Sequence, residues 1–314
     1  MDSNISTYST LLTLEPLGIS PLHILPVFMF GMLTYCAILF FNITLLLTIV
    51  LKQKLHKPMH ILLLNMAIND ITGASALFPQ IMTSMLSQNT SVTYSACYVQ
   101  AFLIHLYGTG TFLILIAMAY DRYIAICCPL KYHALMSTNN LLKIIITVWT
   151  IDFTVIGLLL GLSYRQEICS TRTVDPFCNN PSLLKLICGD IRMNNYYGLS
   201  LTALLHILTL FIMLFTYIQI LITCVSTGKR QSDAKSKAIQ TCGTHLVVYL
   251  CLEFISLFAI ISHRFPNVSQ SIRGTIAAYF MIFPPFLNPL IYGLKTKEIR
   301  QNGTVLFCTK ISQS

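Results

Sequence analysis

Seven long apolar stretches alternate with short polar segments along the chain, and each is long enough to cross a membrane as a helix. Such a crossing needs about 20 mostly apolar residues. Helices are expected because every backbone polar group in lipid must be satisfied within its own segment. The pattern therefore predicts an all-α membrane protein, a seven-helix bundle with spans at about 26–51, 59–85, 97–127, 141–163, 197–226, 237–262 and 272–294.

Composition supports lipid as the solvent. The 314 residues are 55% hydrophobic and only 10% charged, whereas soluble domains carry about 25% charged residues. No internal repeat or long linker divides the chain, so we expect one domain over 1–314. The net charge of +9 is scattered between apolar runs, which argues against nucleic acid as a partner. No cleavable signal peptide is evident, so the first span would act as the targeting signal.

The distribution of basic residues predicts the orientation, because cytoplasmic loops are enriched in Lys and Arg. Fourteen of the 20 Lys and Arg residues fall on one side, which places 1–25 outside the cell and the tail at 295–314 inside. Glycosylation sequons at Asn4, Asn89 and Asn267 agree, although sequons at Asn42 and Asn302 do not. The cytoplasmic set is Lys52, Lys54, Lys57, Arg122, Lys131, Lys143, Lys229, Arg230, Lys235, Lys237, Lys295, Lys297, Arg300 and Lys310.

Four of the eleven cysteines, Cys97, Cys169, Cys178 and Cys188, lie at or near the outer face, where disulfides persist. Four cysteines allow three connectivities, so the residues alone leave the pairing open. At the other end of the chain, 295–308 alternates basic and apolar residues at helical spacing. This spacing predicts a short amphipathic helix on the lipids of the inner leaflet, with Cys308 as a candidate palmitoylation site.

Short motifs at matching depths of consecutive spans narrow the class of protein. They are Asn42, LNMAIND ending at Asp70, AMAYDRYIAIC around Arg122, Trp149, and NPLIY at 288–292. Their order resembles the rhodopsin-like receptors. The blocks LHKPMH (55–60), MAYDRYIAICCPLKY (118–132), KAIQTCGTHL (237–246) and NPLIYGLKTKEIR (288–300) resemble vertebrate odorant receptors. ICGDIRMNNYYG (187–198) and SHRF (262–265) are similar to their fish-like, class I branch.

This resemblance implies a ligand cavity between the third, fifth, sixth and seventh helices, roofed by the outer loop at 164–196. It also implies disulfides between Cys97 and Cys178 and between Cys169 and Cys188. The positions expected to line the cavity are His105, Gly108, Thr109, Leu201, Thr202, Leu205, Glu253, Leu257, Ile260, Ile261 and Arg264. Apolar walls with a few polar groups suit a small amphipathic molecule.

The resemblance further implies a switch at the cytoplasmic ends of the helices. Arg122 would pair with Asp121 at rest and then face a heterotrimeric G protein of the stimulatory, olfactory type, which raises cAMP. The residues expected in coupling and activation are Asp121, Arg122, Tyr123, Tyr217, Asn288, Pro289 and Tyr292. Asp70, Thr111 and Asn288 resemble a buried polar site that sodium occupies in some relatives. The family's usual glutamate is replaced here by Thr111, which puts the ion in doubt.

The roles of three charged residues, Glu253, Asp152 and Arg264, are considered separately. Glu253 stands where odorant receptors carry an aromatic residue, and either makes an internal hydrogen bond or contacts the ligand. Asp152 is assigned no function beyond a polar niche between helices. Arg264, in SHRF, matches the branch whose members recognise carboxylates, so we expect an acidic ligand held by Arg264, with His105 as a further donor.

The alternatives are a non-olfactory rhodopsin-like receptor for a small lipid or peptide and, more remotely, a transporter or channel. Ile104 stands where amine receptors carry an aspartate, and the seventh span lacks the lysine of an opsin. Transporters typically show inverted repeats or broken helices, which are not found. No catalytic or metal-binding motif is present, so we expect no enzyme and no cofactor. The expected location is the plasma membrane, in the cilia of olfactory sensory neurons.

Overall fold

The computed structural model describes residues 11–164, 166–173, 175–226, 232–262, 265 and 270–295. Helices dominate these residues. The seven long ones are α2 (Pro21–Leu51), α3 (Pro58–Ser87), α4 (Tyr94–Cys127), α6 (Thr138–Tyr164), α8 (Arg192–Ser226), α9 (Ser232–Ser262) and α10 (Gln270–Lys295). Shorter elements connect them: β1 (Leu11–Thr13), η1 (Gln53–Leu55), β2 (Ser91–Thr93), η2 (Pro129–Lys131), α5 (Tyr132–Leu135) and α7 (Asn180–Leu184).

Each expected span lies inside one of the seven long helices, and the all-helical membrane fold is confirmed. Six of the helices are long and apolar enough to cross a membrane. The remaining long helix, α9, includes the shorter apolar run Leu246–Ser262. Proline begins α2 and α3, where its missing N–H costs no helical hydrogen bond. The amphipathic helix expected over 295–308 falls almost wholly outside the described residues.

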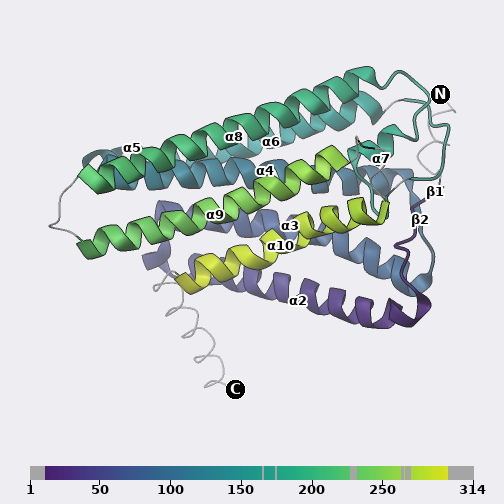
Figure 1. Cartoon of the computed structure of the whole chain (residues 1–314), viewed down its shortest axis with the longest axis horizontal. Helices are drawn as coiled ribbons and strands as arrows, with labels where there is room; N and C mark the ends of the chain where they lie inside the picture. The colour runs from purple at the N-terminus through teal and green to yellow at the C-terminus, as the bar shows by residue number, and fades with distance from the viewer. Residues whose placement is uncertain are drawn as a thin grey trace.

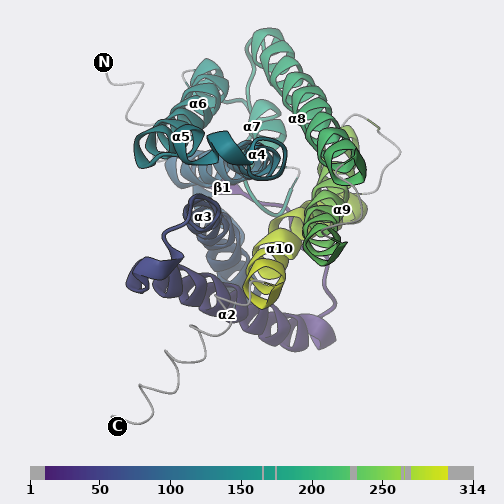
Figure 2. The ribbon, with the colours of Figure 1, turned by 90° about the vertical axis from the view of Figure 1, so that its left-hand side faces the viewer.

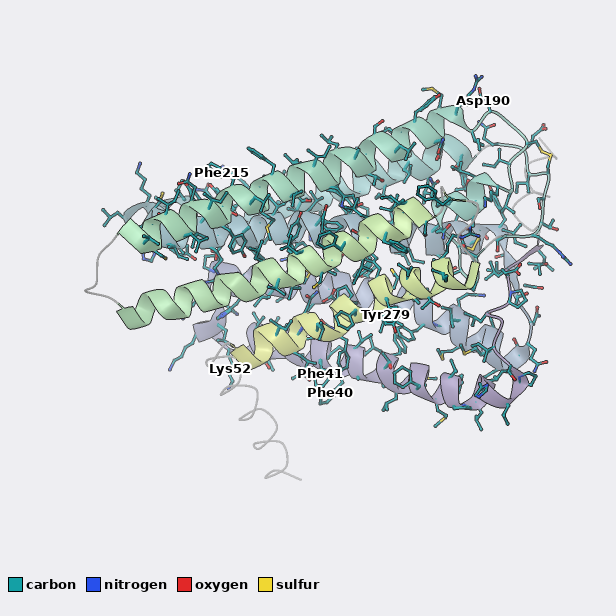
Figure 3. All side chains as sticks on the ribbon, in the orientation of Figure 1. Phe40, Phe41, Lys52, Asp190, Phe215 and Tyr279 are labelled. Atoms are coloured by element: carbon teal, nitrogen blue, oxygen red, sulfur yellow. A yellow bond between two sulfur atoms is a disulfide. The ribbon has the colours of Figure 1, made fainter. Side chains whose placement is uncertain are left out.

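The helices pack as a single bundle whose outer surface is apolar. Figure 2 shows α8 beside α9 and α10 beside α2, and α3 and α4 pack against one another. Aromatic side chains such as Phe40, Phe215 and Tyr279 project outward along the bundle in Figure 3, and about half of each is exposed. Exposed apolar surface of this extent is unfavourable in water. It is the surface that a bilayer would cover.

Polar side chains mark the two ends of the bundle. Lys52 lies at one end and Asp190 at the opposite end (Figure 3). The strands β1 and β2 and the helix α7 gather at the same end as Asp190, whereas α5 lies at the other (Figure 1). With the orientation expected from the basic residues, the end with β1, β2 and α7 is the outer end.

A small sheet at the outer end was not expected from the sequence. β1 pairs antiparallel with β2, with Leu12 opposite Val92. The Thr13 N–H also donates to the Thr171 carbonyl at 2.7 Å, which ties the segment before the first helix to the outer loop. Leu12 is fully buried beneath this sheet. The described N-terminal residues therefore form part of the roof over the bundle.

Candidate functional site

A cavity of about 380 Å³ opens in the outer half of the bundle. Its walls come from α4, α6, α8, α9 and α10, and residues of α7 and the outer loop cover it. Seven of the eleven positions expected from the sequence lie on its wall: His105, Gly108, Thr109, Leu201, Thr202, Leu205 and Ile260. The size falls within the range of small-molecule sites, about 300–1,000 Å³.

Three of the expected positions lie off the wall. On α9 the cavity is lined by Ser256, Ala259 and Ile260, so Leu257 and Ile261 fall outside the lining. Ile261 is about half exposed on the outer surface of the bundle. Glu253 is buried one layer behind the cavity, bonded to His206. Arg264, the eleventh, lies outside the described residues.

The structure adds wall residues that the sequence reasoning did not identify. The roof contributes Phe177, Asn180, Pro181, Leu184 and Lys185, all from α7 and its flanks. The inner wall adds Phe112, His206, Ser256, Phe280 and Met281. Helical spacing on α8 would have suggested His206, because it follows Thr202 by four residues, which is about one turn.

His105 holds the roof in place. Its Nε2 atom accepts a hydrogen bond from the backbone N–H of Asn180 at 3.0 Å, at the start of α7. An acceptor role requires a lone pair on Nε2, so in this arrangement the ring proton sits on Nδ1. The expected donation from His105 to a ligand would therefore have to come from Nδ1.

Both disulfides of the outer end are present. Cys97 is joined to Cys178 and Cys169 to Cys188, which is the pairing that the resemblance implied. The Cys178 N–H also donates to Gln100 Oε1 at 2.8 Å, and the Gln100 amide donates to the Ala76 carbonyl. The Cys97–Cys178 disulfide and the Cys178–Gln100 hydrogen bond therefore act together with the His105–Asn180 bond to fix the loop to α4.

A buried polar layer crosses the middle of the bundle. Asn288 of α10 donates to both carboxylate oxygens of Asp70 on α3, at 3.3 and 3.0 Å. Asn42 of α2 donates to the carbonyl of Pro285, where proline interrupts the helical bonding of α10. Thr111 instead bonds to the Tyr107 carbonyl and accepts from Asn69. Among the described residues, no three side chains of His, Cys, Asp or Glu are grouped as a metal site would require.

Asp152 is fully buried, and neither of its carboxylate oxygens has a hydrogen-bond partner among the described residues. It lies close to Gly110, where an added Cβ would come within 2.8 Å of Asp152 Oδ2 and 2.7 Å of Asn69 Oδ1. Only glycine leaves room for these two side chains. The expected polar niche is therefore a specific contact between α3, α4 and α6.

The inner end of α4 carries the expected arginine. Arg122 Nε lies 3.8 Å from Asp121 Oδ2, and the hydroxyl of Tyr132 on α5 donates to Asp121 Oδ1 at 2.9 Å. Burial, together with the Asp121 carboxylate, raises the pKa of Tyr132, so its hydroxyl remains a donor at neutral pH. Asp121 is buried, whereas the Arg122 side chain stays about one-third exposed.

Three tyrosines, Tyr123, Tyr217 and Tyr292, were expected to take part in coupling and activation. Tyr217 is buried on α8, within the same apolar core as Met118 of α4. Tyr123 instead lies against Phe215, with ring centroids 6.3 Å apart. Tyr292 belongs to α10, but its side chain lies outside what the structure describes.

A seven-helix bundle with an outer cavity, a disulfide-tethered roof and an arginine at the inner end of its third long helix defines a receptor of the G protein-coupled class. The family model described as olfactory receptor matches residues 31–310. The chain belongs to the olfactory receptor family. Receptors of this family bind small-molecule odorants, act on heterotrimeric G proteins and are not enzymes.

Human relatives show the same similarity over most of the chain. Human olfactory receptor 52B2 is 33% identical over 271 residues, covering 86% of this chain and 83% of the relative. Human olfactory receptor 52H1 is 32% identical, covering 85% of each chain. Human olfactory receptor 4F17 is 32% identical, covering 90% of this chain and 92% of the relative. The 52-type relatives agree with the expected class I branch.

Proposed function

We propose that this olfactory receptor binds a small, amphipathic, acidic odorant in the outer cavity and activates a stimulatory, olfactory-type G protein that raises cAMP. The observation that carries the proposal is the 380 Å³ cavity, whose walls include Ile104, Phe112, Leu201 and Phe280. Such walls take up the hydrocarbon part of a ligand, and the few polar groups orient it.

Cations at the outer end of the cavity favour an acid. Lys185 lies on the cavity wall at the end of α7. Arg264 lies outside the described residues, and the SHRF motif makes it the second cation expected to hold the acid group. A guanidinium grips a carboxylate with two charge-assisted hydrogen bonds. The acid group would therefore lie toward the roof, with the hydrocarbon chain directed inward.

Coupling is proposed at the opposite end, where Arg122 is partly exposed beside Asp121 and Tyr132. This arrangement supports release of the arginine toward a G protein. The N-terminus would be extracellular, with Asn89 exposed in the outer segment between α3 and β2 and available for glycosylation. The proposed location is the plasma membrane of the cilia of olfactory sensory neurons.

The acid preference gives the first prediction. Decanoic acid should be more potent than its methyl ester by roughly ten- to a hundredfold in a cAMP assay, because hydrogen bonds to charged groups contribute about 1.5–3 kcal/mol. Arg264→Ala should lower the potency of the acid by a similar factor and barely change that of the ester. Equal potency of acid and ester on the wild-type receptor would exclude carboxylate recognition.

Arg192→Ala serves as the matched control. Arg192 is an outer-end cation that does not line the cavity, and it donates to Asp190 at 2.7 Å. These hydrogen bonds lower the pKa of Asp190 to about 2, so the two charges already satisfy each other on the surface. The difference between acid and ester should therefore persist in this variant.

A further inference from the structure

A histidine–glutamate pair joins α8 and α9 at the inner end of the cavity. His206 Nδ1 lies 2.8 Å from Glu253 Oε1, and the two side chains are only 6% and 5% exposed. His206 lines the cavity, whereas Glu253 stands behind it. We infer that His206, held by Glu253, is the hydrogen-bond donor of a second polar subsite that takes a carbonyl oxygen of the ligand.

The position of His206 makes this subsite the floor of the cavity. Along α8 it is the innermost wall residue, and on α4 the innermost is Phe112. Their rings meet edge to face, with centroids 5.1 Å apart. Ser256, the innermost wall residue of α9, follows Glu253 by three positions. A ligand anchored at the roof would therefore present its far end to His206.

The net charge of the His206–Glu253 pair decides whether His206 Nε2 carries a hydrogen and can donate it to a ligand. An isolated charge buried in an apolar site is costly, so a net neutral pair that shares one proton along the Nδ1–Oε1 bond is favoured. If that proton sits on Nδ1, the ring is an imidazolium, which also carries a hydrogen on Nε2. If it sits on Oε1, the neutral ring must carry its own hydrogen on Nε2. Both forms therefore leave Nε2–H as a donor.

This donor is available to a ligand. Among the described residues no hydrogen bond engages His206 Nε2. Two neighbouring hydroxyls bond to other groups: the Tyr249 hydroxyl donates to Thr209 and lies beside Glu253, and the Ser256 hydroxyl donates to the Glu253 carbonyl. Leu205 and Phe280 are apolar residues of the same cavity wall, and an apolar wall strengthens a hydrogen bond made inside the cavity.

The inference deepens the proposed function, on which it rests, because it takes the cavity as the odorant site. With a cation at the roof and a donor at the floor, the preferred ligand has a carboxylate at one end and a carbonyl near the other. An aliphatic keto acid has this chemistry. A plain fatty acid would leave the Nε2–H without a partner, which reduces its affinity.

The test uses four probes on purified full-length receptor, with ligand-induced thermal stabilisation as the measure of binding. The probes are decanoic acid, the keto acid with a carbonyl at its penultimate carbon, the neutral methyl ketone of the same length, and decane. The variant combines His206→Phe with Glu253→Met, so no buried carboxylate is left unpaired and the contact with Phe112 is kept. Phe254→Leu, on the outward face of α9 beside Glu253, is the control.

We expect the affinity ratio of ketone to parent compound to fall about tenfold from the wild-type receptor to the double variant, in the acid pair and in the neutral pair alike. Phe254→Leu should leave the ratio unchanged. A ratio that is the same in the double variant and the wild type would overturn the inference. So would tighter binding of the matching hydroxy acid than of the keto acid in the wild type, because that would make Nε2 an acceptor.

Different results would contradict carboxylate recognition and the floor subsite at His206. If the acids bind no better than the neutral probes but the ketone ratio still falls in the double variant, carboxylate recognition is wrong and the floor subsite stands. If acids bind better and the ratio does not change, only the floor subsite is wrong. Stabilisation by none of the four probes would overturn both. Should the double variant not fold, the wild-type ketone-to-parent ratios decide, and a ratio below one contradicts the subsite.

Discussion

Replacing Arg122 by alanine should abolish ligand-evoked cAMP while the receptor still reaches the cell surface. The arginine is partly exposed at the inner end of α4, 3.8 Å from Asp121, and contributes little to the buried core. Its loss therefore removes the group that would contact the G protein without opening a cavity in the bundle. The comparison requires cAMP and surface labelling from the same cells, with receptor levels matched to the wild type.

Lys131→Ala provides the matched control for this experiment. Lys131 is an exposed cation on the same side, in η2 between α4 and α5. If a general loss of positive charge were responsible, this variant would lose signalling as well. We expect it to keep most of the response. Undiminished cAMP from a well-expressed Arg122→Ala receptor would refute the assignment of Arg122 to coupling.

The second large effect is expected from removing the disulfide that joins the outer loop to α4. Cys97→Ala combined with Cys178→Ala should sharply reduce delivery of the receptor to the cell surface. Losing a native disulfide costs about 2–5 kcal/mol, which is a large part of the stability of most proteins. The loop would then be held to α4 mainly by the Cys178 N–H bond to Gln100 and by the His105 bond to α7. Replacing both cysteines avoids a stray thiol.

Surface labelling of intact cells measures this loss, and Cys36→Ala is the control because Cys36 is a free, exposed cysteine on α2. The control should be delivered normally. Non-reducing peptide mapping of the wild type should recover Cys97 linked to Cys178. Finding Cys178 linked to Cys169 or Cys188, or normal delivery of the double variant, would contradict the proposed role of the roof.

The helical framework was predictable from the sequence because it depends on local composition. A run of about 20 apolar residues must be a helix in lipid, so each expected span lies inside a helix. The sheet of β1 and β2 was not predictable in the same way. Three-residue strands such as Leu11–Thr13 carry little periodic signal, and their pairing joins positions about 80 residues apart.

Cavity-lining residues were predicted correctly only on helices whose cavity-facing side had been assigned correctly. His105, Gly108 and Thr109 share one face of α4 and line the cavity. On α9 the expected face was rotated, because successive residues differ by about 100° and a small error moves Leu257 and Ile261 off the wall. The His206–Glu253 pair joins two helices and depends on their relative rotation, which the sequence does not contain.

The proposal that the outer cavity is the odorant site is tested most directly by the cAMP response of transfected cells to a panel of small amphipathic acids and ketones. The response is compared between the wild-type receptor, Gly108→Phe and Gly157→Phe. Gly108 lines the cavity, where an added Cβ would lie 3.6 Å from the Phe280 ring, whereas Gly157 has no neighbour within 4 Å. We expect a response in the wild type and in Gly157→Phe, and loss of the response in Gly108→Phe, where the new ring fills the cavity. Equal responses in all three receptors would show that agonists act elsewhere and contradict it.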